Sequence, residues 1–176
     1  MGSTGFSGII RRSTTDDLCA IADCFEHARS FMRANGNPTQ WGTDRPSLNL
    51  VREDIARGNS YVCEHDGEVV ATFAFIIGID PTYNDIDGAW LREAPYGTIH
   101  RMASNGKVKG VAKAVFDWCK QHSVDLRIDT HKDNKPMLHV IDKAGFVHCG
   151  VIIVDNGTPR EAFQYLGNFS LSAINR

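Results

Sequence analysis

Four segments of the chain repeat their apolar residues with the period of an α-helix. The clearest is Thr14–Gly36, which has acidic residues in its first turn and an Asn-Gly pair at its end. A second segment covers about Ser47–Gly58, and two more begin after Gly110 and at Asn134. Each segment carries one apolar stripe, so the pattern predicts about four helices that lie against a shared core.

Other segments follow the period of a β-strand, either as alternating or as short continuous apolar runs. Asp66-Gly67 stands between two of them and predicts a hairpin. The expected strands lie at residues 8–12, 60–65, 68–78, 98–103, 124–130, 146–154 and 160–166. The pattern predicts an α/β (mixed α+β) fold, with a central, twisted, mostly antiparallel mixed sheet of about six to seven strands flanked by about four helices. Residues 79–97 are expected to form a long loop.

The composition fits one globular domain. The chain has 176 residues, of which 42% are hydrophobic and 23% charged, which is ordinary for a globular protein with a substantial core. We expect a single domain over residues 9–168, a flexible N-terminal tail at residues 1–8 and a C-terminal tail at residues 169–176. The net charge of −2 argues against a nucleic-acid partner, because nucleic-acid surfaces are usually strongly basic.

The cysteines and the N-terminus favour a cytoplasmic location. Five widely spaced cysteines without a C-x-x-C pair indicate reduced thiols rather than disulfides or a zinc site, so we expect no metal. The first residues lack the apolar region of a signal peptide. The longest apolar run, Val69–Ile79, is too short to cross a bilayer, and we expect no membrane partner.

The helix that follows Gly110 begins without the acidic residues that favour a helix N-terminus. Lysines stand at positions 107, 109 and 113, and no acid occurs before Asp117. Gly106 and Gly110 leave the backbone bare, and free N–H groups beside lysines favour an anion site, most naturally for phosphate. Lysines that are simply solvated would give the same pattern, so this segment alone leaves both interpretations open.

The segment resembles the pyrophosphate loop of the GCN5-related N-acetyltransferases. That loop follows (Q/R)-x-x-G-x-(G/A), and Lys107–Ala112 matches it with lysine in the first position. The next strand and helix of the family carry an Asn before a segment that ends in Gly-Phe, which corresponds here to Asn134 and Gly145-Phe146. The order of the expected elements agrees with the family over about Gly8–Leu166.

The resemblance implies an acetyl-CoA or other acyl-CoA co-substrate, held where two parallel strands separate. The family's pyrophosphate contacts would correspond to Lys107 and to the backbone N–H groups of Val108, Lys109, Gly110, Val111 and Ala112. The pantetheine arm would pair with the strand edge at Met102, Ala103 and Ser104, and Asn134 would hold its far side.

The implied reaction is direct attack of a primary amine on the thioester in a ternary complex. The backbone N–H of Met102 or Ala103 would polarise the thioester carbonyl, as in an oxyanion hole. An alkyl amine is mostly protonated at neutral pH, so a base must take its proton, and His100 is the candidate beside the acyl site. Asp129 and His131 are alternatives, and a histidine on a strand can also be only a packing residue.

One position departs from the family's pattern. The usual general acid is a Tyr seven residues after the helix-starting Asn, and the seventh residue after Asn134 is Ile141. The leaving-group acid is therefore unassigned. A second hypothesis stays open, in which the chain is a non-catalytic acyl-CoA-binding or regulatory domain with the same fold.

The acceptor site should lie in the parts that vary within the family, which are the first helix pair and the loop before His100. The loop is rich in acids and aromatics, a combination that suits a cationic amine. The candidate substrate-binding residues are Trp41, Tyr83, Asp87 and Trp90. The same residues would also be present if the acids only formed turns and the aromatics only packed at the end of the sheet. We expect a small cationic or amino-acid-like amine as the partner, and a monomer or homodimer.

Overall fold

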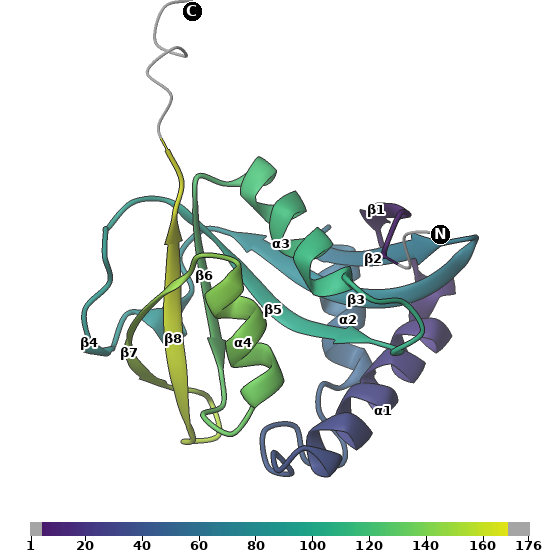
Figure 1. The fold of residues 1–176 in the computed structure, drawn as a ribbon, viewed down its shortest axis with the longest axis horizontal. Coiled ribbons are helices and arrows are strands. Elements are labelled where there is room, and N and C mark those ends of the chain that lie inside the picture. The colour runs from purple at the N-terminus through teal and green to yellow at the C-terminus, as the bar shows by residue number, and fades with distance from the viewer. Residues whose placement is uncertain (1–4, 169–176) are drawn as a thin grey trace, which may run out of the picture.

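The centre of the molecule is one eight-stranded sheet, seen in a computed structural model that describes residues 5–168 (Figure 1). Its strand order is β1-β2-β3-β5-β6-β8-β7-β4. The strands are β1 (Ile9–Arg12), β2 (Ser60–His65), β3 (Glu68–Ile77), β4 (Asp87–Gly88), β5 (Tyr96–Ser104), β6 (Asp125–Thr130), β7 (Val147–Ile153) and β8 (Pro159–Leu166). Only β5 and β6 pair in parallel, and the other neighbours are antiparallel.

Residues 5–168 contain four α-helices. They are α1 (Leu18–Ala34), α2 (Leu48–Ala56), α3 (Val111–His122) and α4 (Lys135–Lys143). The caps follow the sequence signals: the Ser47 hydroxyl accepts the Leu50 amide at the start of α2, and Asn134 caps α4. No helix among these residues combines the length and apolar character needed to cross a membrane.

The helices cover the sheet in two pairs (Figure 1). Helices α3 and α4 pack on one face, where Val115, Phe116 and Ile141 join strand residues in the largest buried cluster. Helices α1 and α2 pack on the other face, in a second cluster that includes Ile21 and Val51. The alternation of side chains along each strand lets a single sheet serve both clusters.

Strands β5 and β6 run side by side for only part of their length. Three residue pairs join them, and the last is Thr98 with Arg127. Beyond that point β5 continues to Ser104 with β3 as its partner, and β6 continues to Thr130 with β8 as its partner. The two strands therefore separate and leave a V-shaped opening in the middle of the sheet.

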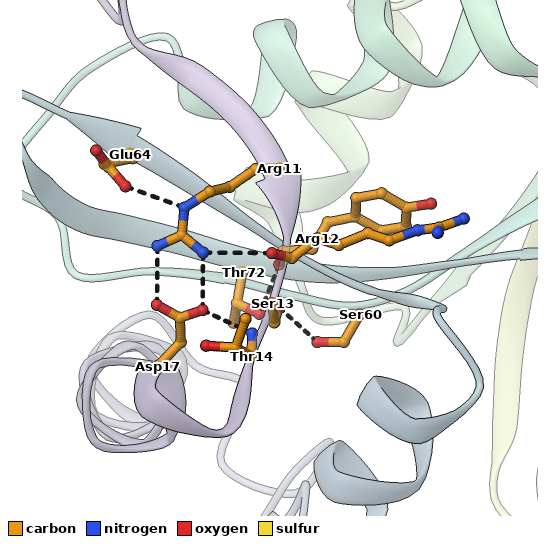
Figure 2. Close-up of polar contacts among 9 residues, drawn as sticks. Arg11, Arg12, Ser13, Thr14, Asp17, Ser60, Glu64 and Thr72 are labelled. Atoms are coloured by element: carbon orange, nitrogen blue, oxygen red, sulfur yellow. Dashed lines mark hydrogen bonds and ion pairs between the residues drawn. The ribbon is translucent and has the colours of Figure 1, made fainter.

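The N-terminal strand is attached to the first helix by one arginine (Figure 2). The Arg11 guanidinium donates to both carboxylate oxygens of Asp17 at 2.9 Å, and its Nε donates to Glu64 at 3.0 Å. The Ser13 and Ser60 hydroxyls form a buried hydrogen bond of 2.8 Å. These contacts fix the start of α1 against β2, and α1 in turn leads to the loop beside the opening.

The fold class predicted from the sequence is confirmed. The structure adds an eighth strand to the sheet and a contact of Phe6 with the core. The sheet has eight strands because two residues of the expected loop at 79–97, Asp87 and Gly88, pair with β7. The expected tail at residues 169–176, and residues 1–4 of the other tail, lie outside the described residues. Within residues 5–8, Phe6 packs against the larger core cluster, and its amide donates to the Lys109 carbonyl at 2.9 Å.

Candidate active site

A cavity of about 810 Å³ occupies the V-shaped opening. Its walls come from β5 and β6, from the loop between α1 and α2, from α2, from the start of α4, and from the turn between β7 and β8. At the centre, residues 99–102 of β5 face residues 128–130 of β6. The cavity thus lies where the hydrogen bonding between the two parallel strands has stopped.

The wall contributed by β5 contains a bulge. The β3–β5 register shifts between Thr72 and Ala74, which places an extra residue on β5 between His100 and Ala103. Arg101 adopts a left-handed φ of 53° there, and its guanidinium donates to Asp54 of α2 at 2.6 and 3.0 Å. Past Thr98 the β6-facing edge of β5 has no strand partner among residues 5–168. Its backbone polar groups are therefore available to a ligand.

Helix α3 starts as a bare N-terminus. Gly110 is its N-cap in the left-handed conformation, with φ 79° and without a capping side chain. The first turn contains no acid, and its backbone N–H groups have no intrahelical acceptor. The helix dipole adds partial positive charge at this end, so the N-terminus of α3 can hold an anion. Lys107, nearby, forms an exposed ion pair with Glu68.

His27 of α1 lies against the same loop. A Cβ atom built on Gly106 would come within 2.4 Å of the His27 Nε2, so a larger residue would displace the His27 side chain, and the φ of 76° itself favours glycine. The sequence offered no signal for this contact, because His27 and Gly106 are far apart along the chain.

His100 and Asp80 form a hydrogen-bonded pair in the cavity wall. The His100 Nε2 and an Asp80 carboxylate oxygen are 2.7 Å apart, and both side chains are mostly buried. The other Asp80 oxygen accepts the Thr82 amide at 2.9 Å. Burial alone would raise the pKa of Asp80, but the hydrogen bond and charge of His100, with the Thr82 amide, lower it to about 2. An ionised carboxylate can only accept a hydrogen bond, so the Nε2–H donates to it, which leaves Nδ1 as the atom of a neutral imidazole that can take a proton.

Asp129 stands across from His100 on β6, also in the cavity wall. It accepts a hydrogen bond of 2.7 Å from the Tyr83 hydroxyl. Burial and the charge of Asp129 raise the pKa of Tyr83 well above its ordinary value, so this phenol stays protonated. His131, the other candidate base, has its Nδ1 as acceptor for the Asp133 amide at 3.1 Å.

Of the four residues expected to bind the acceptor, the structure brings one to the cavity wall and places the others outside it. Trp41 lies in the cavity wall and packs edge-on against Phe25. Tyr83 is 1% exposed and lies beneath the wall, where it supports Asp129. Trp90 donates its indole N–H to the Tyr83 carbonyl, and the Arg127 guanidinium stacks on its ring at 4.0 Å. Asp87 pairs with β7 in the exposed strand β4, outside the cavity lining.

Several residues that the resemblance assigns to the acyl-CoA or to catalysis lie at the opening. His100, Met102 and Asn134 line the cavity, and Ala103 and Ser104 continue the free edge of β5. The Asn134 amide is already engaged: its oxygen accepts the Met137 amide at 3.3 Å, and its nitrogen donates to Gln40 at 3.0 Å. The segment Lys107–Ala112 forms the loop and first turn of α3.

The position of the missing family tyrosine is part of the core. Ile141 is 0% exposed and packs in the cluster between the sheet and α3 and α4. Tyr165 belongs to the same cluster, where Lys120 lies 4.4 Å from the centre of its ring. Neither residue lines the cavity.

Comparisons with solved structures agree with this arrangement. An acetyltransferase of the GNAT family from Streptococcus agalactiae is 29% identical, with a TM-score of 0.83 over 91% of this chain and 95% of that chain. In fold and by this similarity, the chain resembles the GCN5-related N-acetyltransferases. A Staphylococcus aureus protein assigned as an acetyltransferase is 25% identical, with a TM-score of 0.63 over 90% of this chain and 99% of that chain. No protein-family model and no curated protein matches the sequence.

The GCN5-related fold is shared more widely than the sequence. A Salmonella typhimurium protein with its cofactor acetyl-CoA is 14% identical, with a TM-score of 0.57 over 93% of this chain and 95% of that chain, and shows the fold alone. The agreement among these structures identifies the protein as an acyltransferase.

Proposed function

We propose that the protein is an acetyl-CoA-dependent N-acetyltransferase that acetylates a primary amine of a small acceptor by direct attack. The observation that carries this proposal is the pair of His100 and Asp80 at the point where β5 and β6 separate, beside the bulge at Arg101. A base oriented by a carboxylate, next to a strand edge with free N–H groups, is the set of groups that acyl transfer to an amine requires.

The donor would occupy the opening and the N-terminus of α3. These parts fit an acyl-CoA because the free edge of β5 can pair with an extended chain of amides, and the bare helix start can hold its pyrophosphate. We assign the pantetheine contact to Met102, Ala103 and Ser104. We assign the pyrophosphate contact to the loop and first turn at Lys107–Ala112. We call this half of the site, made of those two segments, the donor side.

The acceptor would enter from the opposite part of the cavity, which we call the acceptor side and define by His100, Asp80, Asp129, Trp41 and the start of β8. The His100 imidazole takes a proton from the acceptor's ammonium group. The amine nitrogen then forms a bond to the thioester carbonyl carbon, and the backbone N–H at Met102 or Ala103 stabilises the oxygen of the tetrahedral intermediate. The carbon–sulfur bond breaks and the nitrogen gives up its second proton, either to water, so that coenzyme A leaves as a thiolate, or to the departing sulfur, so that it leaves as a thiol.

The departing thiolate does not require a tyrosine. A thiol has a pKa of about 8.5, so its anion is a fair leaving group near neutral pH. The buried Ile141 at the family's tyrosine position is therefore compatible with turnover. The five free cysteines suit a reducing compartment, and we expect the enzyme to work in the cytoplasm.

The direct test is release of coenzyme A from acetyl-CoA by the full chain, measured with a panel of primary amines. The panel contains amino acids, amino-acid amides, polyamines and aminoglycosides. Amine-dependent release of thiol, together with mass-spectrometric detection of the acetylated amine, supports the proposal. Binding of acetyl-CoA by calorimetry without turnover on any amine would instead favour a non-catalytic acyl-CoA-binding domain.

A further inference from the structure

Arg160, at the start of β8, is a buried cation in the cavity wall. It is 7% exposed and lines the cavity on the acceptor side. Its two terminal nitrogens donate to the Thr158 hydroxyl at 2.8 Å, to the Pro159 carbonyl at 3.0 Å and to the Gln40 carbonyl at 3.2 Å. All three acceptors are uncharged. Within residues 5–168, Arg160 forms no ion pair with a carboxylate, and its Nε has no hydrogen-bond acceptor.

A buried guanidinium without a counter-charge is costly, because taking a charge out of water is repaid only by a well-placed opposite charge. Burial lowers the pKa of Arg160, and the carboxylates that act against this effect are Asp129 and Asp155. Both have other partners. Asp129 accepts the Tyr83 hydroxyl, and Asp155 is ion-paired with Arg45 at 3.3 Å. The wall therefore keeps one positive charge that these side chains do not directly pair.

The register of the sheet places this charge beside the acceptor's reacting end. Asp129 of β6 is opposite Ala162 of β8, and Arg160 is two residues before Ala162 on the same face. Arg160 and Asp129 are therefore diagonal neighbours, and both line the cavity that also contains His100. A cation, an anion and a base along one wall match a ligand that carries both a carboxylate and an amine.

We propose that Arg160 binds a carboxylate of the acceptor, so that the acceptor is an amino acid or a close analogue with its acid group a few bonds from the reacting amine. The acceptor's carboxylate supplies the missing counter-charge at Arg160, and its amine lies toward Asp129 and His100. This inference rests on the proposed function and narrows its acceptor class. Of the two acceptor classes expected from the sequence, cationic and amino-acid-like, it selects the second.

The experiment compares each free amino acid with its own α-carboxamide, which keeps the amine and the side chain and removes the negative charge. The wild-type protein should show a kcat/KM for the best free acid about 10–100-fold above that for its amide, which is the usual value of a hydrogen bond to a charged group. Arg160→Gln should lower kcat/KM for the acid by the same factor and leave the amide nearly unchanged. Arg160→Lys should retain part of the preference.

A matched control is Arg45→Gln. Arg45 is a cation of the same cavity wall, but it is half exposed and already paired with Asp155. Its removal should change the ratio of acid to amide by less than about threefold, as is usual for an exposed pair.

Different results overturn the inference and the proposed function. Equal use of acids and amides by the wild-type protein overturns the role of Arg160 while acetyl transfer stands. An equal loss of kcat/KM on acids and amides in Arg160→Gln shows that Arg160 only holds the loop at Gln40, and this result also overturns the inference.

If no amine is acetylated, the proposed function fails, and calorimetry of the same acids and amides with the CoA-loaded protein decides the inference. Preferential binding of the acids supports it, and its absence overturns it. The comparison of acids with amides on the wild-type protein does not depend on the folding of any variant.

Discussion

The donor side and the acceptor side of the opening are built from different parts of the polypeptide. The donor side consists of backbone: the free edge of β5 and the N-terminus of α3, where glycine replaces a capping residue. The acceptor side consists of charged side chains from distant elements, among which His100 pairs with Asp80 and Arg160 lies beside Asp129. Substitutions of side chains leave most of a backbone site unchanged, whereas a site made of side chains can change its acceptor with a few substitutions.

The difference predicts that the two sides can be damaged separately. A change at the donor side should remove acetyl-CoA binding whatever the acceptor is. A change at the acceptor side should alter rate or specificity and leave acetyl-CoA binding intact.

The largest effect is expected from Gly110→Asp. The new carboxylate would lie at the helix start to which we assign the pyrophosphate, and it would occupy the positive end of the helix dipole in place of the phosphate. Affinity for acetyl-CoA, measured by calorimetry, should fall by at least about 100-fold, as expected when a ligand's main charged contact is replaced by repulsion. The helix should still form, because an acid at this end favours it.

Gly157→Asp is the control for this change. Gly157 has a φ of 78°, almost the same as the 79° of Gly110, and an added Cβ would meet open space. It therefore reproduces the backbone strain in a turn away from the donor side. Gly110→Asp with wild-type affinity for acetyl-CoA would remove the helix start from the donor site.

Asp80→Asn tests the acceptor side at its positioning residue. The amide keeps the shape but loses the charge that orients His100, and turnover should fall about tenfold while acetyl-CoA affinity is unchanged. Unchanged turnover would mean that Asp80 is not needed to orient the base.

The same variant should show a pH-dependent loss of stability. The pKa of Asp80 is about 2 in the folded protein, below the ordinary 3.8, so folding favours its carboxylate. Asp80 therefore contributes stability above about pH 4, and this contribution is lost as the pH falls toward 2. Urea unfolding should show a deficit of about 1–2 kcal/mol for Asp80→Asn at pH 5 to 6, shrinking toward pH 2. A deficit that is independent of pH would show that packing, not charge, accounts for it.

Ile141→Tyr asks whether the donor side needs the family's tyrosine. Because Ile141 is fully buried among α3, α4 and the sheet, the larger side chain and its hydroxyl should cost about 1–3 kcal/mol of unfolding free energy. Turnover per folded molecule should not rise. A tyrosine hydroxyl could assist the departing thiolate only if it reached a wet position, and the full burial of this site removes that condition. A clear gain in turnover would show that the hydroxyl reaches the leaving thiolate after all.

Tyr165→Phe should have the smallest effect. The ring belongs to the core cluster outside the cavity lining, so steady-state turnover should stay within about twofold of the wild type. A variant that loses most of its activity would place the leaving-group acid on β8 and make that strand part of both sides.

The bare start of α3 could be predicted from the sequence because its signals are local. Gly106, Gly110 and the lysines lie within eight residues, and the missing acid in the first helical turn has a direct physical meaning. The helices and most strands were predicted for the same reason, from periodicity and caps.

The acceptor side was less accessible because its contacts join residues that are distant in sequence. Asp80 and His100 are 20 residues apart, and the loop that brings them together carries no repeating pattern. Tyr83 and Trp90 were expected to contact the acceptor, but their hydrogen bonds and stacking place them in the support beneath the wall. Arg160 had no sequence signal, since an arginine at a strand start is ordinarily exposed.

The separation of the two sides is tested most directly by His100→Ala, with acetyl-CoA affinity and turnover measured on the same preparation. The account predicts wild-type affinity by calorimetry and a kcat about 100-fold lower on the amine that the panel identifies. Wild-type turnover would contradict the role of His100 as the base. Loss of acetyl-CoA binding together with turnover would contradict the division of the opening into a donor side and an acceptor side.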